Sequence, residues 1–288
     1  MRLLTAWLWS LVPTFVLAVP ATTVYLHRTV THRALVLHPV VEWLFKFANW
    51  ITTGVDPAVW VAVHRKHHAY SDLEIAPDKR DPHSPWLEGF WHIQLGNVWY
   101  YLAELRKHPE TLTLFARDVL ARRGWWDRHF FRRGWLGLLL GTAMLCVALF
   151  VHSLALDGKP VAEALEDGLW LGSAAAGIHA LTFVFLLNPS VNALCHWPHR
   201  WLGGYQSSRA EHAFSTANNW VVALLTAGEG FHNNHHDQPA TARFAWNRAE
   251  LVADWGYWAV IVPLGWLRLA TSIRLPQSGQ RAHHAQAS

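Results

Sequence analysis

Three long stretches of the chain are almost free of charged or histidine side chains. Residues 3–26 have none, and residues 134–156 and 168–195 have one each, His152 and His179. A helix needs about 20 apolar residues to cross the roughly 30 Å hydrocarbon layer of a bilayer. The pattern therefore predicts three membrane-spanning helices, at about residues 3–26, 134–156 and 168–195.

Two further apolar stretches are too short or too polar to be predicted as spans. Residues 37–54 include two charged side chains and an asparagine, which favours an interfacial or re-entrant helix. Residues 254–270 combine tryptophans and a tyrosine with apolar residues, a pattern typical of a segment at headgroup level. We therefore expect an all-α integral membrane protein with about three transmembrane helices, interfacial helices and a cytosolic helical cap. Residues 1–276 are predicted to be a single domain, and residues 277–288 a polar, disordered tail.

Composition agrees with a membrane protein and argues against other classes. Hydrophobic residues make up 52% of the 288 residues, charged residues only 15%, and tryptophan occurs 19 times. The two cysteines, Cys146 and Cys195, support neither a disulfide framework nor a cysteine-based zinc site. Despite a net charge of +4, no nucleic-acid-binding module is recognisable. The first apolar stretch could be a secretory signal ending near Ala21, but it exceeds a signal core of about 7 to 15 residues, so retention as an anchor is favoured.

The distribution of basic residues predicts the orientation. Residues 157–167, between the second and third predicted spans, contain four acidic residues and one lysine. Because loops rich in Lys and Arg stay in the cytoplasm, this short acidic hairpin should face outward. All of the 24 Lys and Arg residues except Arg2 and Lys159 then lie on the inner side. We therefore expect residues 27–133 and the chain from His196 onward to face the cytoplasm, at the inner or plasma membrane of the cell.

Nine histidines fall into three boxes and one isolated position. The boxes are His27-Arg-Thr-Val-Thr-His32, His64-Arg-Lys-His67-His68 and His232-Asn-Asn-His235-His236, and the isolated residue is His196. In the second and third boxes, the spacing i, i+3, i+4 brings three imidazoles to one face of a helix, where they can converge on metal. His27 and His32 are about 140° apart on an ideal α-helix, so they converge only if the helix ends between them or they straddle the site. We interpret the eleven other histidines as surface or core residues.

The number and type of these ligands predict a site for two metal ions. Imidazole suits zinc, copper, iron and nickel, so ligand type leaves the metal open. Nine nitrogens exceed the needs of one ion and would supply two ions with four or five ligands each. Asn192 precedes His196 by four residues and could face the same site through a water molecule.

The order of these boxes resembles that of the membrane fatty acyl desaturases, above all the acyl-CoA type that includes stearoyl-CoA desaturase. The spacings are His-x4-His, His-x-x-His-His, Asn-x3-His and His-x-x-His-His. The surrounding words are also similar: His64-Arg-Lys-His-His-Ala-Tyr-Ser71, Asp81-Pro-His-Ser-Pro85, Gly89-Phe-Trp-His92 and Gly228-Glu-Gly-Phe-His-Asn-Asn-His-His236. The resemblance covers about residues 15–250. Related alkane hydroxylases usually have His-x3-His-His in the middle, and many acyl-lipid desaturases begin with His-x3-His, so the spacing favours the acyl-CoA and delta-9 branch.

The resemblance implies an oxygen-dependent desaturase with two iron ions. The nine histidines of the boxes would hold the ions, and Asn192 would contact the centre through water. Such enzymes use O2 to remove two hydrogens from a saturated acyl chain, carried by CoA or a lipid, and leave a cis double bond, here predicted at delta-9. No dinucleotide-binding glycine fingerprint or haem domain is visible, so electrons would come from an external ferredoxin, or from cytochrome b5 with its reductase. A lipid hydroxylase of the same superfamily is the first alternative, and a histidine-rich membrane metal transporter is the second.

The sequence also suggests residues that contact the substrate. Tryptophans near the boxes could line a dry tunnel for the acyl chain, although interfacial anchoring is the alternative for each: Trp86, Trp91, Trp99, Trp197 and Trp201. Basic residues could contact an anionic head group, although their predicted cytoplasmic position alone would explain them: Arg65, Lys66, Arg200 and Arg209. Glu229, three residues before the last box, could support a ligating histidine or serve only solvation or helix capping.

Three features depart from the commonest family pattern. The helix that precedes the first box in four-span members is expected to be missing, which would turn the N-terminus outward. Residues 73–80 are interpreted as an insertion before Asp81, and the sequence of residues 196–206 differs from the commonest family sequence. Substrate identity and double-bond position therefore stay open.

Overall fold

A computed structural model describes residues 2–83, 85–196 and 203–277 of the chain. Almost all of its regular structure is helical, and several of the helices are wound with the wider π-helical turn. The first half of the chain contains α1 (Arg2–Leu11), η1 (Val12–Ala18), η2 (Ala21–Thr31), β1 (Val36–Leu37), α2 (Pro39–Thr53), α3 (Pro57–Ala69), β2 (Glu74–Ala76), β3 (Lys79–Arg80), α4 (Pro85–Glu88), α5 (Phe90–Lys107), α6 (Glu110–Phe115), α7 (Arg117–Ala121) and η3 (Asp127–Phe131). The second half contains α8 (Gly134–Ala155), α9 (Val161–Ala180), η4 (Leu181–Leu187), α10 (Asn188–Cys195), η6 (Glu211–Ala213), α11 (Trp220–Leu225), α12 (His232–Asp237), α13 (Arg248–Leu251), η7 (Gly256–Ile261), α14 (Val262–Trp266) and β4 (Ala270–Thr271).

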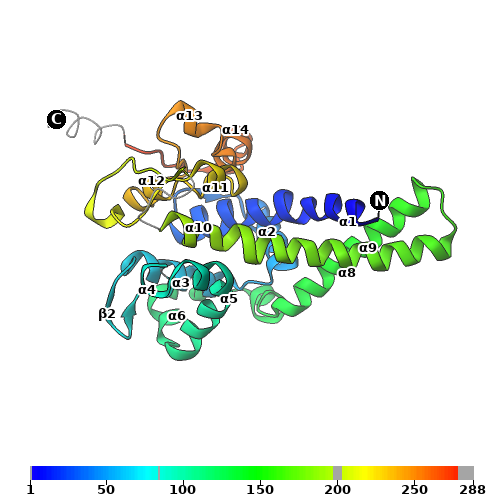
Figure 1. Ribbon diagram of the computed structural model, residues 1–288, viewed down its shortest axis with the longest axis horizontal. Helices are drawn as coiled ribbons and strands as arrows, with labels where there is room; N and C mark the ends of the chain where they lie inside the picture. The colour runs from blue at the N-terminus through cyan, green and yellow to red at the C-terminus, as the bar shows by residue number, and fades with distance from the viewer. Residues whose placement is uncertain (1, 84, 197–202, 278–288) are drawn as a thin grey trace.

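Three helical segments are long and apolar enough to cross a membrane, which confirms the predicted number. The first covers Arg2–Thr31 and joins α1, η1 and η2; the second is α8; the third covers Val161–Cys195 and joins α9, η4 and α10. In Figure 1 these segments form an elongated bundle, and the remaining helices gather at one end of it as a cap. The N-terminus lies near the opposite end, by the connection between α8 and α9.

The acidic segment between the second and third spans is mostly helical, not the hairpin loop that was expected. α9 begins at Val161, so three of the four acidic residues lie in its first two turns, and Glu163 lies in the first turn, where negative charge stabilises a helix N-terminus. Asp167 accepts a hydrogen bond from Ser153 of α8 at 2.9 Å, and the guanidinium of Arg2 lies 3.1 Å from the Asp167 carboxylate. These contacts hold the starts of the first and third spans together at the end of the bundle away from the cap.

The short helix α2 packs closely against the second span. It has 15 residues, in agreement with the prediction of a helix too short to cross the membrane, and it ends at Gly54 in the left-handed region with φ 65°. α8 approaches it through glycines: a Cβ on Gly137 would lie 2.3 Å from the carbonyl oxygen of Trp50, and one on Gly141 would lie 2.1 Å from that of Ile51. Such close approach is available only to residues without a side chain. The position of α2 relative to a bilayer stays a prediction.

The cap has two halves that flank the end of the first span. In Figure 1, α3 to α6 lie on one side and α11 to α14 on the other. The largest hydrophobic cluster joins η2 to α2, α3 and the C-terminal segment. The fully buried Arg28 of η2 donates a hydrogen bond to Asp254 at 2.8 Å and stacks on the ring of Phe244 at 4.1 Å. The C-terminal half of the cap is therefore attached to the helix that carries the first histidine box.

The aromatic segment near the C-terminus is partly packed and partly exposed. Residues 254–270 form η7 and α14 and then join β4, which pairs antiparallel with β1 so that Leu37 lies opposite Ala270. Tyr257 packs on the main hydrophobic cluster, whereas Trp258 and Trp266 are exposed. This division into an inner and an outer face agrees with the amphipathic segment that was predicted.

Candidate metal centre

The first histidine box lies at the end of a π-helix. The backbone N–H of His32 donates to the carbonyl oxygen of His27 at 3.1 Å, an i→i+5 bond. Residues five apart in such a helix lie one above the other, whereas in an α-helix they diverge. The two imidazole centroids are 4.9 Å apart. The spacing that is unfavourable on an α-helix therefore becomes convergent, because the backbone is wound more widely here.

The other two boxes lie on α-helices, as their spacing predicts. α3 starts at the N-cap Asp56, whose side chain accepts a hydrogen bond from the backbone of Ala58, and its last two turns carry the second box. The third box occupies α12, which begins at His232. His196 follows the last residue of α10 as its C-cap. All nine predicted histidines thus lie on or directly after helices at the end of the molecule where the cap lies.

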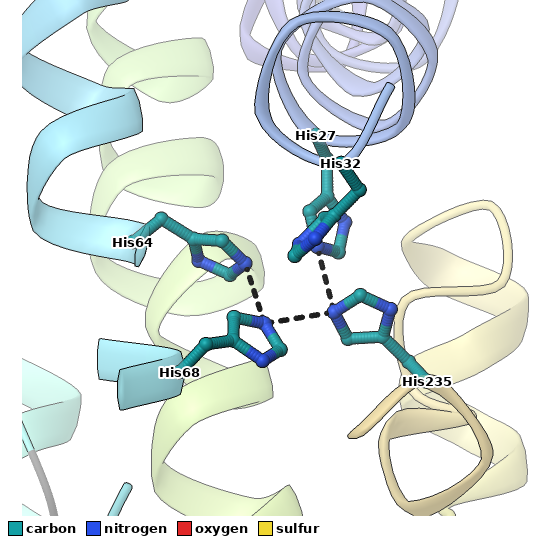
Figure 2. A group of neighbouring side chains, drawn as sticks. All are labelled: His27, His32, His64, His68 and His235. Atoms are coloured by element: carbon teal, nitrogen blue, oxygen red, sulfur yellow. Dashed lines mark hydrogen bonds between the residues drawn. The ribbon is translucent and has the colours of Figure 1, made fainter. Parts of the chain in front are cut away.

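The structure brings the nine histidines together in two neighbouring groups. A group of five combines all of the first box with parts of the other two: His27, His32, His64, His68 and His235. Figure 2 shows these five rings from three different chain segments turned toward one centre. A group of four contains the remaining residues: His67, His196, His232 and His236. Because consecutive histidines of one box fall into different groups, the two groups share α3 and α12.

The ring nitrogens approach one another as ligands of a common ion would. In the five-histidine group, Nε2 of His235 lies 3.0 Å from Nε2 of His27 and 3.0 Å from Nε2 of His68. In the four-histidine group, Nε2 of His232 lies 2.8 Å from that of His196 and 3.1 Å from that of His236. Metal–nitrogen bonds of about 2.0–2.1 Å place neighbouring ligand nitrogens about 3 Å apart. A set of convergent imidazole nitrogens therefore fits a cation in each group.

Burial keeps most of these imidazoles in the neutral form that binds metal. Burial, followed by the neighbouring imidazoles, lowers the pKa of six of them: His32, His64, His68, His232, His235 and His236. His67 differs, because the carboxylate of Asp81 outweighs burial and raises its pKa. The neutral imidazole is the form in which histidine coordinates metal.

Three carboxylates touch the outer nitrogens of the histidines. Asp81 lies 2.9 Å from Nδ1 of His67, and Asp72 lies 2.9 Å from Nδ1 of His196. Glu229 contacts Nδ1 of His27, so its predicted contact with a boxed histidine is present in the structure. Sequence reasoning missed Asp72 and Asp81, although the word Asp81-Pro-His83 was a signal for the second. Such partners hold the ring so that Nε2 faces the metal.

Among the described residues, two histidines outside the boxes are buried, His83 and His179. The ring of His83 stacks on that of His67 with centroids 4.9 Å apart, and burial together with His67 lowers the pKa of His83 to about 4. His179 lies between α9, the first span and α2, with Nε2 3.0 Å from the carbonyl oxygen of Thr52. His179 is thus a buried core histidine, as was expected for the histidines outside the boxes, whereas His83 lies against a boxed ring.

A cavity of about 300 Å³ lies beside the five-histidine group. Leu26, which precedes His27, lines it together with Trp60. The indole of Trp60 stacks on His64 with centroids 4.7 Å apart and meets the ring of His27 edge-on. The apolar part of the remaining wall comes from α3, α5 and η4 and includes Val59, Val98, Leu102, Phe183 and Val184. Polar side chains from α2 and the junction after it complete the wall: Asn49, Thr53 and Asp56. Pockets of this size and character suit an apolar ligand.

Asn192 is held near this cavity by another asparagine. Its side-chain amide donates to Oδ1 of Asn97 at 3.2 Å, and Asn97 lines the cavity. The predicted contact of Asn192 with the metal centre through water stays a prediction.

The structure describes three of the tryptophans that were predicted to line an acyl tunnel, and none of them lines this cavity. Trp86, Trp91 and Trp99 are exposed and do not line the cavity beside the histidines. Trp99 lines a different cavity, of about 250 Å³, which reaches Asp81. Trp60, which the sequence did not single out, lines the cavity instead. Trp197 and Trp201 lie outside the described residues.

Two of the predicted head-group contacts are structural instead. Lys66 is buried and pairs with Glu104 of α5 at 2.7 Å. Arg65 pairs with Asp118 and donates to the carbonyl oxygens of the first box's helix, including that of Thr31. Both side chains thus attach α3 to its neighbours, and their charges are already compensated. Arg209 is exposed, and Arg200 lies outside the described residues.

Comparison with known proteins gives a consistent result over nearly the whole chain. The family model for fatty acid desaturases matches residues 5–269. An acyl-CoA C20 Delta5-desaturase of Anemone leveillei is 30% identical over 261 residues, which are 88% of this chain and 69% of that protein. A delta-9 acyl-lipid desaturase of Arabidopsis thaliana is 28% identical, covering 91% of this chain and 73% of that protein. An icosanoyl-CoA 5-desaturase of Limnanthes douglasii is 29% identical, covering 96% of this chain and 67% of that protein.

Proposed function

The chain belongs to the fatty acid desaturase family, and from that premise we propose that it introduces a cis double bond, at delta-9, into a saturated acyl chain carried as an acyl-CoA. The observation that carries this proposal is a pair of neighbouring convergent histidine groups, of which the five-histidine group lies beside a largely apolar cavity and shares Trp60 with its wall through the ring of His64. The relatives named above include desaturases of acyl-CoA and of acyl-lipid substrates. The box spacing of this chain favours the acyl-CoA carrier.

The nine histidines would hold two iron ions, five ligands on one and four on the other. Bound iron would supply the one-electron chemistry that activates O2 toward an unactivated methylene, which side-chain acids and bases cannot attack. Each double bond would consume one O2, two electrons and two protons and release two water molecules. Ferredoxin, or cytochrome b5 with its reductase, would supply the electrons.

The protein's own contribution is to place the acyl chain and to exclude water. Leu26 and Trp60 form the wall of the cavity nearest the five-histidine group, so a chain seated there would lie with its methylenes next to the metal centre. The remaining apolar wall would keep the chain extended and dry. Asn192 would support the site through water, as the family resemblance implies. The end of the molecule where the cap and these residues lie would face the cytoplasm.

Lipid profiling with labelled substrates tests the proposed reaction and carrier together. Membranes that contain the protein and an electron donor are supplied with stearoyl thioester in one arm and stearoyl phospholipid in the other. A product lighter by two mass units, formed from the thioester with the double bond at delta-9, is expected. A product heavier by sixteen mass units would identify a hydroxylase, and uptake of metal ions without O2 consumption would identify a transporter.

Filling the cavity tests whether it is the acyl site. Val184 lines the cavity, so Val184→Trp should abolish conversion of an 18-carbon chain while iron content stays unchanged. Leu186→Trp, two residues along the same helix at an exposed position, is the matched control and should keep wild-type turnover. Equal turnover in the two variants would show that the acyl chain lies elsewhere.

A further inference from the structure

The hairpin at residues 72–81 carries both acidic partners of the four-histidine group. β2 and β3 form this hairpin, with Glu74 opposite Arg80. It coincides with the stretch that reads as an insertion relative to the commonest family wording. Asp72 stands just before the first strand and Asp81 just after the second, so the strand pairing brings the two carboxylates together.

The base of this hairpin is closed by the same residues that touch the histidines. The backbone N–H of Asp81 donates to the carbonyl oxygen of Leu73 at 2.9 Å, and that of Asp72 donates to the Asp81 carboxylate at 2.8 Å. Asp72 adopts the left-handed conformation, with φ 57°, which aspartate tolerates better than most residues. The two side chains are therefore fixed relative to each other before they reach the histidines.

Each carboxylate has a direct bond to a different histidine of the same group. The side chain of Asp81 is fully buried, and its two carboxylate oxygens lie 3.0 and 2.9 Å from Nδ1 of His67. The side chain of Asp72 is only 5% exposed, and its Oδ2 lies 2.9 Å from Nδ1 of His196. Because Nδ1 donates its proton to the carboxylate, Nε2 is left as the ligand atom.

The need for this support differs between the members of the group. His232 and His236 are one turn apart on α12, so the helix itself aligns their rings. His196, in contrast, is the C-cap residue that follows the last helical residue of α10, so it has no partner one turn away on α12 to share its alignment. In the described part of the chain, the carboxylate in contact with the five-histidine group is that of Glu229, at Nδ1 of His27, and not one from the hairpin.

We propose that the hairpin at residues 72–81 is a positioning device for the four-histidine group, in which Asp72 orients His196 and Asp81 orients His67. The hairpin then sets how tightly this group holds its ion without affecting the ion of the five-histidine group. This inference rests on the proposed function, because it requires that both groups hold iron.

Asp72→Asn is the primary test, since it removes the charge and keeps the size of the side chain. The purified protein is loaded with ⁵⁷Fe and measured by Mössbauer spectroscopy and by release of iron to a chelator. We expect wild-type protein to hold two ions per chain, and Asp72→Asn to release one of them about 10- to 100-fold more readily, as is typical for loss of such a partner. Only one of the two quadrupole doublets should change.

Matched variants separate positioning from general damage to the fold. Glu74→Gln removes a carboxylate from the same hairpin, but this side chain is 52% exposed and lies 3.7 Å from Arg80, away from the histidines; it should release iron as wild type does. Asp81→Asn, which keeps one acceptor oxygen, should loosen the same ion as Asp72→Asn. Glu229→Gln should loosen the other ion.

The outcomes distinguish this inference from the proposed function. Unchanged iron release in folded Asp72→Asn and Asp81→Asn, or equal loosening of both ions, would overturn the role of the hairpin and leave the desaturase proposal intact. Wild-type protein that binds no iron would overturn the proposed function, and the inference with it.

Discussion

Individual histidines in this protein differ by the group they join, and not by the box they come from. His67 and His68 are adjacent in the chain, yet they point into different groups, and so do His235 and His236. On a helix, residues i and i+1 diverge by about 100°, so a pair of neighbouring histidines is suited to serve two centres. The pattern His-x-x-His-His is thus a natural way to build two sites from one helix turn.

Single substitutions in the two groups should therefore remove different ions. His67→Ala is expected to loosen the ion of the four-histidine group, and His235→Ala that of the five-histidine group, with turnover lost in both because the proposed reaction needs both ions. The helical fold should persist, since a ligand contributes more to metal binding than to packing. Iron per chain and circular dichroism are the measurements. His212→Ala, at a side chain that is 63% exposed, serves as the control and should keep two ions; wild-type activity in either ligand variant would contradict its assignment.

The lowered pKa values also predict how the metal-free protein responds to acid. Burial lowers the pKa of six histidines below their value of about 6.5 in an unfolded chain. The unfolded state then binds more protons than the folded state, so the free energy of unfolding should fall as the pH drops through about 6.5. His67, whose pKa is raised, opposes this trend but is only one residue. Thermal unfolding of the iron-free protein in detergent should give a lower midpoint at pH 5.5 than at pH 8, and an equal or higher midpoint would contradict this account.

At the scale of elements, helix winding and helix contact decide where the groups lie. The π-helical turn of η2 aligns His27 with His32. The glycines of α8 let α2 pack closely on it, so that Gly54, at the start of the junction between α2 and α3, lies against the backbone of Gly134. Gly54 and Asp56, at the junction of α2 and α3, also line the cavity beside the histidines. The packing of α2 on α8 is therefore linked to both the second box and the cavity.

Enlarging one glycine at this contact should disturb the site from a distance. Even the Cβ of Gly137→Leu would meet the backbone of Trp50 at 2.3 Å, so α2 must move. Overpacking of this kind costs about 1–3 kcal/mol, and we expect a lower unfolding midpoint together with reduced turnover. Gly177→Leu, on α9 where a Cβ would meet nothing within 4 Å, is the matched control and should behave as wild type. Equal unfolding midpoints for the two variants would mean that the contact between α2 and α8 does not contribute to stability.

At the scale of the whole molecule, the histidines lie at the cap end of the bundle, and the α8–α9 connection lies at the other end (Figure 1). Arg2 and Lys159 are both near this far end, where Asp167 contacts them. The other Lys and Arg residues that the structure describes belong to residues 28–133 and 203–277, the segments predicted to lie on the inner side, in line with an inward-facing cap. This separation also argues against the transporter alternative, because transporters bind ions near the middle of the membrane.

Labelling of intact cells should test this orientation. In a variant without native cysteines, Leu156→Cys at the α8–α9 connection should react with a membrane-impermeant maleimide, because this position is 76% exposed and would face outward. Leu114→Cys in α6, which is 70% exposed on the cap, should react only after the cells are opened. Labelling of both positions in intact cells, or the reverse pattern, would contradict a cytoplasmic cap.

Much of this architecture can be predicted from the amino-acid sequence, because it depends on local periodicity and composition. Apolar length alone predicts three spans, and the i, i+3, i+4 spacing predicts that each of the two boxes presents its imidazoles on one helix face. Only the tertiary structure decided how the nine histidines divide into groups of five and four. It also decided that Asp72 contacts His196 and that Asp81 contacts His67. The position of the exposed tryptophans away from the cavity is a third feature of this kind. These features join residues far apart in the chain, such as His67 and His236, and depend on backbone winding and close helix contacts that no short sequence pattern encodes.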